Sequence, residues 1–364
     1  MTDVRTQKLA QTLAKYCIYA QEGEAIGITA PPAAEPLVVP LYEELLKRKA
    51  LPVIRMTPEG CTAATLRSAK PDFYHTINPA EKALVSKLDA SIRIEASTNT
   101  RALSSANPKK QAALTKRMRS LMKSARISKW SITLFPTAAY AQDADMSLEE
   151  FENFVYGATF STEDNPPAAW RALARKQGRL IAKLEGAENV RIVGPGTDLS
   201  FSIKGRTFVN SDGKRNMPSG EVFTGPVESS AEGYIEYDYP VCHNGREVEG
   251  IRLVFKKGKV VEATATKNQA YLRAMLDMDK GARYLGELGI GTNFQIQQFV
   301  KTILFDEKIG GTVHLALGQS YPETGGTNKS SLHWDMIKDL RKGGELIIDG
   351  KIIQKDGKFA KGFF

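Results

Sequence analysis

The chain has 364 residues, of which 42% are hydrophobic and 25% charged, proportions typical of a soluble globular protein. Its 50 Lys and Arg against 41 Asp and Glu give a formal net charge of +9, and this excess is spread along the sequence. The densest basic run, residues 116–129, mixes cations with apolar residues at helical spacing, which favours a solvated amphipathic helix over a nucleic-acid-binding surface. No apolar run is long enough to predict a membrane-spanning segment.

The three cysteines, Cys17, Cys61 and Cys242, are far apart, and no Cys-x-x-Cys sequence occurs. This usage indicates reduced thiols and therefore predicts a cytoplasmic protein. The N-terminus has the pattern of an amphipathic helix and lacks the apolar stretch of a signal peptide.

Helical and extended patterns alternate through residues 1–187. Ser147 and Glu150 have the spacing of a capping box, which marks the start of a helix. Apolar periodicity predicts the other helices and the strands: helices over 4–20, 36–50, 80–89, 107–126 and 167–185, and strands over 24–30, 51–56, 91–97 and 130–137. The alternation predicts an open α/β domain with a largely parallel sheet. No GxGxxG sequence follows any of these strands, so a dinucleotide-binding site is not expected.

Residues 188–364 have a different texture, with many short apolar runs separated by turn residues. Segment 189–210 is rich in strand formers, and segment 251–265 has the pattern of a hairpin that turns at Lys257-Gly258. Segment 345–359 carries two Asp-Gly turns between apolar runs, and a helix is expected over 267–280. These patterns predict a mixed, strand-rich α+β C-terminal domain that begins near residue 188.

Residues 305–339 hold two of the four histidines of the chain, among carboxylates and glycines. His333 and Asp335 are spaced i, i+2, which places both side chains on one face of a strand, and His314 lies in an alternating, strand-like run. Imidazole together with carboxylate is typical ligand chemistry for zinc, cobalt or manganese. His75 and His243 lack such neighbours and are expected to be structural or exposed.

Further acids occur in settings that suit a metal ion. Glu221 is flanked by turn-forming Pro and Gly, and Glu287 lies among glycines and apolar residues, where an unpaired carboxylate would be costly to bury. Glu307 and Tyr321 lie seven residues before and after His314. Three Glu, two His and one Asp are enough for two divalent ions that share a water or a carboxylate, which is the design of two-metal hydrolases.

The ordered motifs GEVFTGP, GELGIGTN, DEKIGGTVHLALGQSYPETGG and HWDMI resemble the thermophilic aminopeptidase family of aminopeptidases T, S and II. The layout, including WSITLFPT and GTDLSFSIKGR, is similar over essentially the whole chain. The resemblance implies a cytoplasmic, dimeric exopeptidase with an α/β N-terminal domain and a C-terminal domain that binds two divalent ions (Zn, Co, Mn or Mg). The positions that match the family's metal ligands are Glu221, Glu287, Glu307, His314, His333 and Asp335, and its active-site tyrosine matches Tyr321. Glu307 is either a ligand or a residue in contact with one.

The hypothesis from the sequence is a metal-dependent aminopeptidase that hydrolyses peptides with a free N-terminus through a metal-activated water. Glu221 or Glu287 is expected to carry the proton from water to the leaving amine, and Tyr321 to donate a hydrogen bond to the oxyanion. One alternative is another dinuclear hydrolase such as a phosphoesterase, although the sequence has no phosphate cradle at a helix N-terminus. The other is a non-catalytic, metal-stabilised protein that binds peptides. No nucleic-acid or membrane partner is expected.

Overall fold

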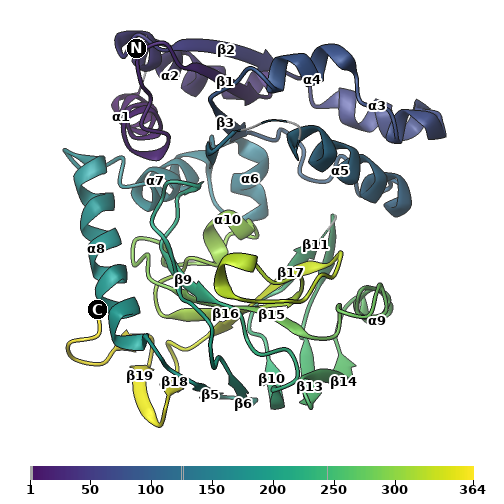
Figure 1. Cartoon of the computed structure of the whole chain (residues 1–364), viewed down its shortest axis with the longest axis vertical. Coiled ribbons are helices and arrows are strands. Elements are labelled where there is room, and N and C mark those ends of the chain that lie inside the picture. The colour runs from purple at the N-terminus through teal and green to yellow at the C-terminus, as the bar shows by residue number, and fades with distance from the viewer. Residues whose placement is uncertain (1–2, 124, 126, 244) are drawn as a thin grey trace. The chain divides into compact units, whose positions relative to one another are not determined.

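The fold comes from a computed structural model that describes the whole chain except residues 1–2, 124, 126 and 244 (Figure 1). The chain divides into two compact units, the first made of Met1–Ala169 and Gly213–Pro218 and the second of Trp170–Asp212 and Ser219–Phe364. A domain boundary near residue 188 remains a prediction.

The first unit is built on a five-stranded sheet in the order β2-β1-β3-β4-β8, in which every neighbouring pair is parallel. Its strands are β1 (Ala25–Ala30), β2 (Leu51–Met56), β3 (Ala90–Glu95), β4 (Lys129–Leu134) and β8 (Asn216–Met217). Its helices are α1 (Val4–Thr12), a π-helix (Leu13–Cys17), α2 (Glu35–Lys47), α3 (Gly60–Ser68), α4 (Pro79–Val85), α5 (Pro108–Lys123), α6 (Ala138–Asp143) and α7 (Leu148–Ala158), with short 3₁₀ turns at Pro32–Ala34 and Pro71–Tyr74. This arrangement confirms the predicted α/β domain with its parallel sheet.

Local sequence signals account for several of these elements. The capping box at the start of α7 is present, because the Ser147 hydroxyl accepts from the Glu150 backbone N–H and the Glu150 carboxylate accepts from the Ser147 N–H. The helix predicted over 107–126 is α5, although positions 124 and 126 lie outside the described residues.

The helix predicted over 80–89 is shorter in the structure, where α4 ends at Val85. The four residues that follow lead the chain into the sheet instead. The Asp89 N–H donates to the carbonyl of Ala25 at 2.9 Å, and the Asp89 carboxylate accepts from the Ala25 N–H at 2.8 Å. These two bonds to the first residue of β1 replace a further helical turn.

The second unit begins along α8 (Pro166–Leu184) and holds two larger antiparallel sheets. The eight-stranded sheet has the order β14-β13-β10-β6-β5-β18-β19-β20, from β5 (Asn189–Gly194), β6 (Thr197–Ser202), β10 (Glu232–Glu236), β13 (Arg252–Lys256), β14 (Lys259–Thr264), β18 (Glu345–Ile348), β19 (Lys351–Lys355) and β20 (Lys358–Phe359). The five-stranded sheet has the order β17-β16-β15-β9-β7, from β7 (Val209–Ser211), β9 (Glu221–Thr224), β15 (Leu285–Gly291), β16 (Thr312–Gly318) and β17 (His333–Asp339). The unit also holds the hairpin β11 (Val241–His243) and β12 (Arg246–Val248), helices α9 (Gln269–Leu276) and α10 (Ile303–Asp306), and a 3₁₀ turn at Pro322–Thr324. A strand-rich, antiparallel second unit agrees with the predicted fold class.

The predicted hairpins turn where the sequence places them. Lys257-Gly258, Asp349-Gly350 and Asp356-Gly357 each have positive φ at both positions, as two-residue type I′ turns require. Glycine at the second position adopts positive φ without steric strain. These dipeptides therefore identify the hairpins β13-β14, β18-β19 and β19-β20 from the sequence alone.

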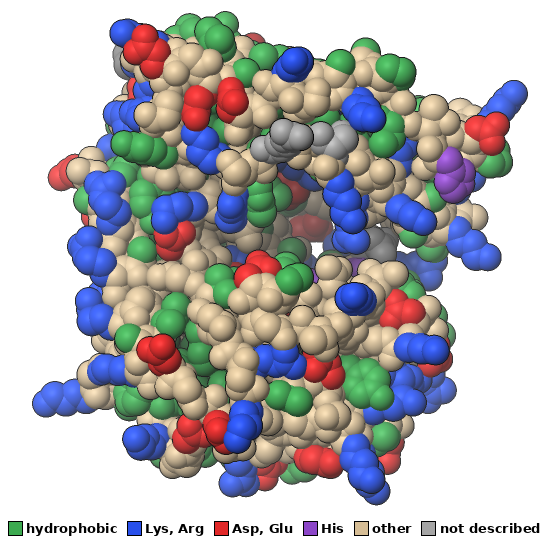
Figure 2. Space-filling model, in the orientation of Figure 1, with side chains coloured by type: hydrophobic (Ala, Val, Ile, Leu, Met, Phe, Trp, Pro, Cys, Tyr) green, Lys and Arg blue, Asp and Glu red, His purple; other side chains and the backbone are tan. Residues whose placement is uncertain are grey.

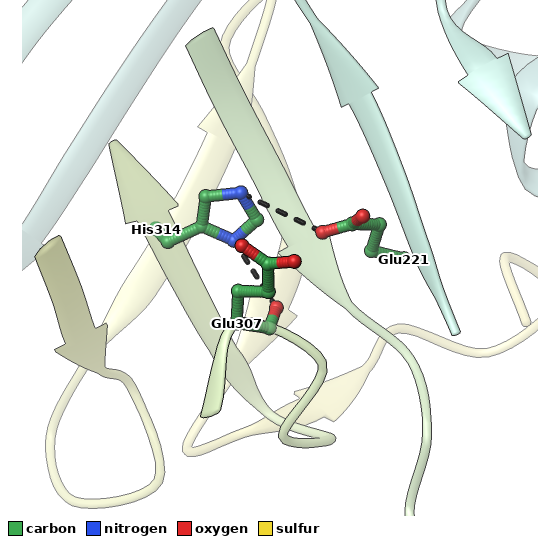
Figure 3. A group of neighbouring side chains, drawn as sticks. All are labelled: Glu221, Glu307 and His314. Carbon is green, nitrogen blue, oxygen red and sulfur yellow. Dashed lines mark hydrogen bonds and ion pairs between the residues drawn. The ribbon is translucent and has the colours of Figure 1, made fainter. Parts of the chain in front are cut away.

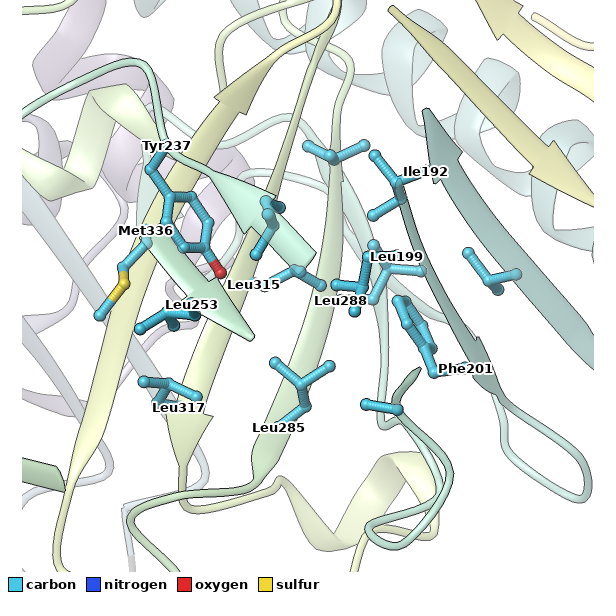
Figure 4. Packing of buried hydrophobic residues seen from close by; sticks show 14 of the residues in the cluster. Ile192, Leu199, Phe201, Tyr237, Leu253, Leu285, Leu288, Leu315, Leu317 and Met336 are labelled. Atoms are coloured by element: carbon cyan, nitrogen blue, oxygen red, sulfur yellow. The ribbon is translucent and has the colours of Figure 1, made fainter. Parts of the chain in front are cut away.

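One hydrophobic core joins the two antiparallel sheets of the second unit (Figure 4). Leu199 and Phe201 of β6 pack in the same cluster as Leu288 of β15 and Leu315 and Leu317 of β16. Each fully buried side chain of this size contributes about 1.5–3 kcal/mol. The core therefore holds one face of the five-stranded sheet in place and leaves the opposite face for polar side chains.

Basic and acidic side chains are interspersed on the face of the molecule that Figure 2 displays, and the blue side chains do not gather into one patch there. Among the described residues, no helix has the length and apolar character needed to cross a membrane.

Candidate metal centre

The face of the five-stranded sheet opposite the core carries acidic and histidine side chains from four strands. They are His333 and Asp335 of β17, His314 of β16, Glu287 of β15 and Glu221 of β9. Asp335 and Glu287 both pair with Ala316, and Glu221 pairs with Gly291. Because side chains alternate between the faces of a strand, this register brings the five groups to one side, including His333 and Asp335 at their i, i+2 spacing.

Glu307, the residue directly after α10, completes the set. The six side chains form two groups: Glu221 with Glu307 and His314, and Glu287 with His333 and Asp335. Within each group, one potential ligand atom per residue lies within 4.8 Å of the others. Figure 3 shows the first group, in which dashed lines join the His314 ring to the carboxylate of Glu221 and to the backbone oxygen of Glu307.

Both histidines are oriented by hydrogen bonds from the nitrogen that faces away from the carboxylates. Nδ1 of His314 lies 3.1 Å from the backbone oxygen of Glu307, and Nδ1 of His333 lies 2.8 Å from that of Gln319. A carbonyl accepts from Nδ1–H, so a neutral imidazole in this position has its Nε2 lone pair directed into the cluster. Metal-binding histidines commonly have this arrangement.

Glu287 lies between the two histidines. Its Oε1 is 3.7 Å from Nε2 of His314, and its Oε2 is 3.2 Å from Nε2 of His333. His314 Nε2 is also 3.5 Å from Oε2 of Glu221, and His333 Nε2 is 3.5 Å from Oδ1 of Asp335. The carboxylate of Glu287 therefore faces both groups, one oxygen to each.

These residues fit divalent cations. Glu221, Glu287 and His314 are at most 5% exposed. Oε2 of Glu221 and Oδ1 of Asp335 are buried and accept no hydrogen bond from any residue that the structure describes. Buried carboxylate oxygens need a hydrogen-bond donor or a cation, and two imidazoles with four carboxylates form a donor set suited to zinc, cobalt or manganese.

The protonation equilibria reflect the same concentration of negative charge. Burial would lower the pKa of His314 and of His333, but the carboxylates around them raise both well above the usual histidine range. Burial raises the pKa of Glu307 to about 7, in spite of the neighbouring Lys308. Burial would also raise the pKa of Asp335, yet His333 holds it well below the usual range. The cluster therefore stabilises positive charge strongly.

Lys308 is a functional candidate that the sequence did not reveal. Its side chain is 0% exposed, and its Nζ lies 3.1 Å from Oε1 of Glu221 and in contact with Oε1 of Glu307. The only signal in the sequence is a Lys next to Glu in a stretch that is otherwise apolar and glycine-rich, which does not distinguish a buried cation from a surface one.

Two buried amides hold the backbone around Glu221, and neither was predicted. Gln177 of α8 donates from Nε2 to the carbonyl of Glu221 at 2.9 Å and to Oγ1 of Thr292 at 3.1 Å. Asn293 donates from Nδ2 to the carbonyl of Ser219 at 2.9 Å. Gln177 lies more than forty residues before Glu221 in the sequence, so no local pattern links them.

Tyr321 lies at the edge of the cluster. Its ring is edge-on to Phe223 and to His333, with centroid separations of 5.5 and 5.1 Å. Burial and the nearby carboxylates raise its pKa, so the phenol stays protonated and remains a hydrogen-bond donor. The residue as a whole is 37% exposed, so Tyr321 is partly open to solvent.

Two carboxylates fasten the segment between Tyr321 and His333. Glu228 accepts from the backbone N–H and the hydroxyl of Thr327, at 2.7 and 2.8 Å. Asp279 accepts from the Ser330 hydroxyl at 2.8 Å and the Ser331 N–H at 2.7 Å. These bonds fix the path by which the chain enters β17.

The remaining histidines are outside the cluster, as expected. His75 is exposed. Nδ1 of His243 lies 2.9 Å from the hydroxyl of Tyr271, and its ring packs 5.3 Å from that of Trp334. Asp306, although next to Glu307, turns away and accepts from the Val300 N–H at 2.8 Å.

Sequence comparison gives matches over most of the chain. A family model described as thermophilic metalloprotease (M29) matches residues 2–359. Aminopeptidase 2 of Geobacillus stearothermophilus is 28% identical over 397 aligned residues, which cover 96% of this chain and 94% of that protein. Aminopeptidase T of Thermus thermophilus is 32% identical over 219 residues, which cover 54% of this chain and 53% of that protein.

Solved structures share the fold. The structure of wild-type AmpT from Thermus thermophilus superposes with a TM-score of 0.85 at 24% identity and covers 98% of this chain and 99% of that one. The structure of a 2,5-dihydroxypyridine dioxygenase from Pseudomonas putida superposes with a TM-score of 0.59 at 14% identity, over 98% and 97% of the two chains. The names of these two proteins describe different chemistries, so the activity has to be argued from the site and the family rather than from the fold.

Proposed function

The chain belongs to the thermophilic metalloprotease (M29) family, and on that premise we propose that it is an aminopeptidase with a two-ion centre. The proposed ligands are Glu221, Glu307 and His314 for one ion and Glu287, His333 and Asp335 for the other. The observation that carries the proposal is the carboxylate of Glu287, which has one oxygen toward each histidine and so suits a ligand shared by two ions. The relatives named as aminopeptidases support a peptide substrate.

When bound, the two ions supply Lewis-acid polarisation of a carbonyl and a lowered pKa for an attacking water. Residues of the chain would carry out the proton transfer. The sequence leaves Glu221 and Glu287 open for proton transfer, and Glu287 is proposed to hold both ions with one oxygen toward each histidine, which leaves Glu221 as the candidate. Oε1 of Glu221 is bound to Lys308, so Oε2, which faces His314, is the atom through which Glu221 would either hold the ion or take the proton.

The family and the relatives named as aminopeptidases also support a peptide with a free amine over a phosphate ester. Cleavage by an aminopeptidase depends on the charge and the lone pair of the substrate amine.

Substrates with free and acetylated N-termini test this proposal directly. We expect cleavage of a free aminoacyl anilide, no measurable cleavage of the acetylated compound, and loss of activity on dialysis against a chelator. Circular dichroism should change little on chelation, because the core of the second unit does not include the cluster. Equal rates on the two substrates would indicate an endopeptidase, and full activity without metal would rule out the two-ion centre.

Replacing Tyr321 by Phe should lower kcat on the order of a hundredfold, with KM and metal content almost unchanged. The substitution removes the hydroxyl proposed to donate to the oxyanion and keeps the ring that packs against Phe223 and His333. Steady-state kinetics together with elemental analysis would measure both effects. Wild-type kcat in the variant would show that the hydroxyl has no catalytic role.

The proposal also covers the identity of the ions, the oligomeric state and the cellular compartment. Zinc, cobalt, manganese and magnesium are the candidates for the ions, and elemental analysis of the purified protein would identify them. A cytoplasmic homodimer is proposed from the resemblance to aminopeptidases T, S and II, and analytical ultracentrifugation would test the dimer.

A further inference from the structure

Lys308 is an ammonium group enclosed within the candidate metal centre. Its side chain has no solvent exposure, and Nζ contacts Oε1 of Glu221 at 3.1 Å and Oε1 of Glu307. A lysine is rarely buried to this extent unless it is paired. Here it is paired with two carboxylates that are both candidate ligands.

The backbone fixes where this ammonium lies. The Lys308 N–H donates to the carbonyl of Phe305 at 2.9 Å, and the Lys308 carbonyl accepts from the Asn293 N–H at 3.1 Å. Asn293 in turn binds the carbonyl of Ser219, two residues before Glu221, through its side chain. The lysine and Glu221 are therefore held by the same short network.

The contacts of Lys308 divide the oxygens of each carboxylate. On Glu221, Oε1 binds Lys308 while Oε2 faces Nε2 of His314 at 3.5 Å. On Glu307, Oε1 likewise binds Lys308 and leaves Oε2. A carboxylate with two free oxygens can bind a metal ion through both of them, whereas a carboxylate with one oxygen occupied by an ammonium offers only the other.

We propose that Lys308 is a positioning residue that restricts Glu221 and Glu307 to one oxygen each toward a bound ion. The proposal rests on the two-ion function given above and goes beyond it. A coordination position that a second carboxylate oxygen would fill is left for water or for the substrate, as catalytic metal sites require. Without Lys308, both glutamates are free to bind through two oxygens and to close that position.

Cobalt provides the test, because the visible absorbance of Co²⁺ weakens as its coordination number rises. The metal-free wild-type protein and Lys308→Met are each loaded with Co²⁺, and the bound ions are counted by elemental analysis. Methionine keeps much of the length of the lysine side chain and removes its charge and its donors. We expect both proteins to bind two ions, with the absorbance per bound ion lower by about twofold or more in Lys308→Met. Turnover in the variant should fall on the order of ten- to a hundredfold.

Lys338→Met is the matched control. Lys338 is 1% exposed in the same unit, but its Nζ binds the carbonyl of Pro195 at 2.9 Å and Asp238 at 3.2 Å, not the cluster. Lys338→Met should keep the wild-type cobalt spectrum. A change seen only in Lys308→Met is then due to Lys308 and not to the loss of a buried lysine in general. If Lys308→Met does not fold, Lys308→Gln retains one donor group and should give an intermediate absorbance.

The outcomes separate this proposal from the proposed function. An unchanged spectrum in Lys308→Met with two ions bound would overturn the role of Lys308 and leave the two-ion centre intact. Loss of an ion from Lys308→Met would also overturn it, because Lys308 would then maintain the ligands rather than restrict them. A wild-type protein that binds no cobalt would refute the proposed function itself, and with it the role of Lys308.

Discussion

Glu287→Gln is expected to remove both metal ions and to lower kcat/KM by a thousandfold or more. Glutamine keeps the size of the side chain but replaces an anionic oxygen with an amide nitrogen that cannot be a ligand. Because the two oxygens of Glu287 face His314 and His333 separately, one substitution weakens both groups. A loss of about 4 kcal/mol of transition-state stabilisation, typical of removing a catalytic metal ion, corresponds to about a thousandfold in rate.

His333→Ala and Glu345→Gln give the comparison that this prediction needs. His333→Ala removes a ligand from one group only, so it should retain the ion held by Glu221, Glu307 and His314. Glu345 of β18 forms an ion pair with Lys355 of β19 and is not part of the cluster. Glu345→Gln should therefore retain both ions and full activity. Elemental analysis after gel filtration would distinguish the variants. Retention of both ions by Glu287→Gln would show that this carboxylate is not a shared ligand.

A second variant, Glu221→Gln, tests the proposed proton transfer. If Glu221 takes the proton from water, its substitution should abolish turnover while the ion at Glu287, His333 and Asp335 stays bound. Turnover close to that of the wild type in Glu221→Gln would refute both the proton-transfer role of Glu221 and its assignment as a ligand.

The sequence predicted most elements of the fold because the signals were local. The capping box at Ser147 and the Asp-Gly turns at Asp349 and Asp356 depend only on neighbouring residues, and each appears in the structure. The end of α4 at Val85 was missed because Asp89 bonds to β1, more than sixty residues away in the chain. Pairing of this kind is not encoded in the periodicity of a single segment.

The sequence likewise predicted those features of the candidate site that depend on local signals, and missed those that depend on tertiary contacts. The spacing of His333 and Asp335 predicted a shared face, since two residues on one strand need no knowledge of the sheet. The position of Glu287 between the two histidines depends on the strand order β17-β16-β15-β9, which no local pattern gives. Gln177 and Lys308 were missed because each acts through a contact with Glu221 that only the tertiary structure creates.

The strand order also explains why small residues lie between the ligands. In the five-stranded sheet, Gly289 pairs directly with His314 on one side and with Phe223 on the other. The imidazole of His314 lies over Gly289, in the space that a side chain would otherwise fill. Gly289, the middle glycine of GELGIGTN, is therefore required by the side chain of the neighbouring strand. Its own backbone does not require glycine, since its φ is not positive.

Gly289→Ala is accordingly expected to lower kcat/KM on the order of a thousandfold while the protein stays folded. A methyl group at this position would lie 2.6 Å from Nδ1 of His314 and closer still to Cε1 and Nε2, so the ring has to move. Movement of the ring breaks the hydrogen bond from Nδ1 to the carbonyl of Glu307 and withdraws Nε2 from the cluster. At least the ion proposed for Glu221, Glu307 and His314 should be lost, and such a loss amounts to about 4 kcal/mol of catalysis.

Gly178→Ala provides the control for the same chemical change. Gly178 lies in α8, where an added methyl group meets no atom within 4 Å, so alanine should be tolerated there and should raise stability by about 0.5–1 kcal/mol. Thermal unfolding, metal content and kinetics of the two variants would be measured together. If Gly289→Ala keeps both ions and wild-type activity, the His314 ring does not need the space above Gly289, and the geometry assigned to this half of the centre is wrong.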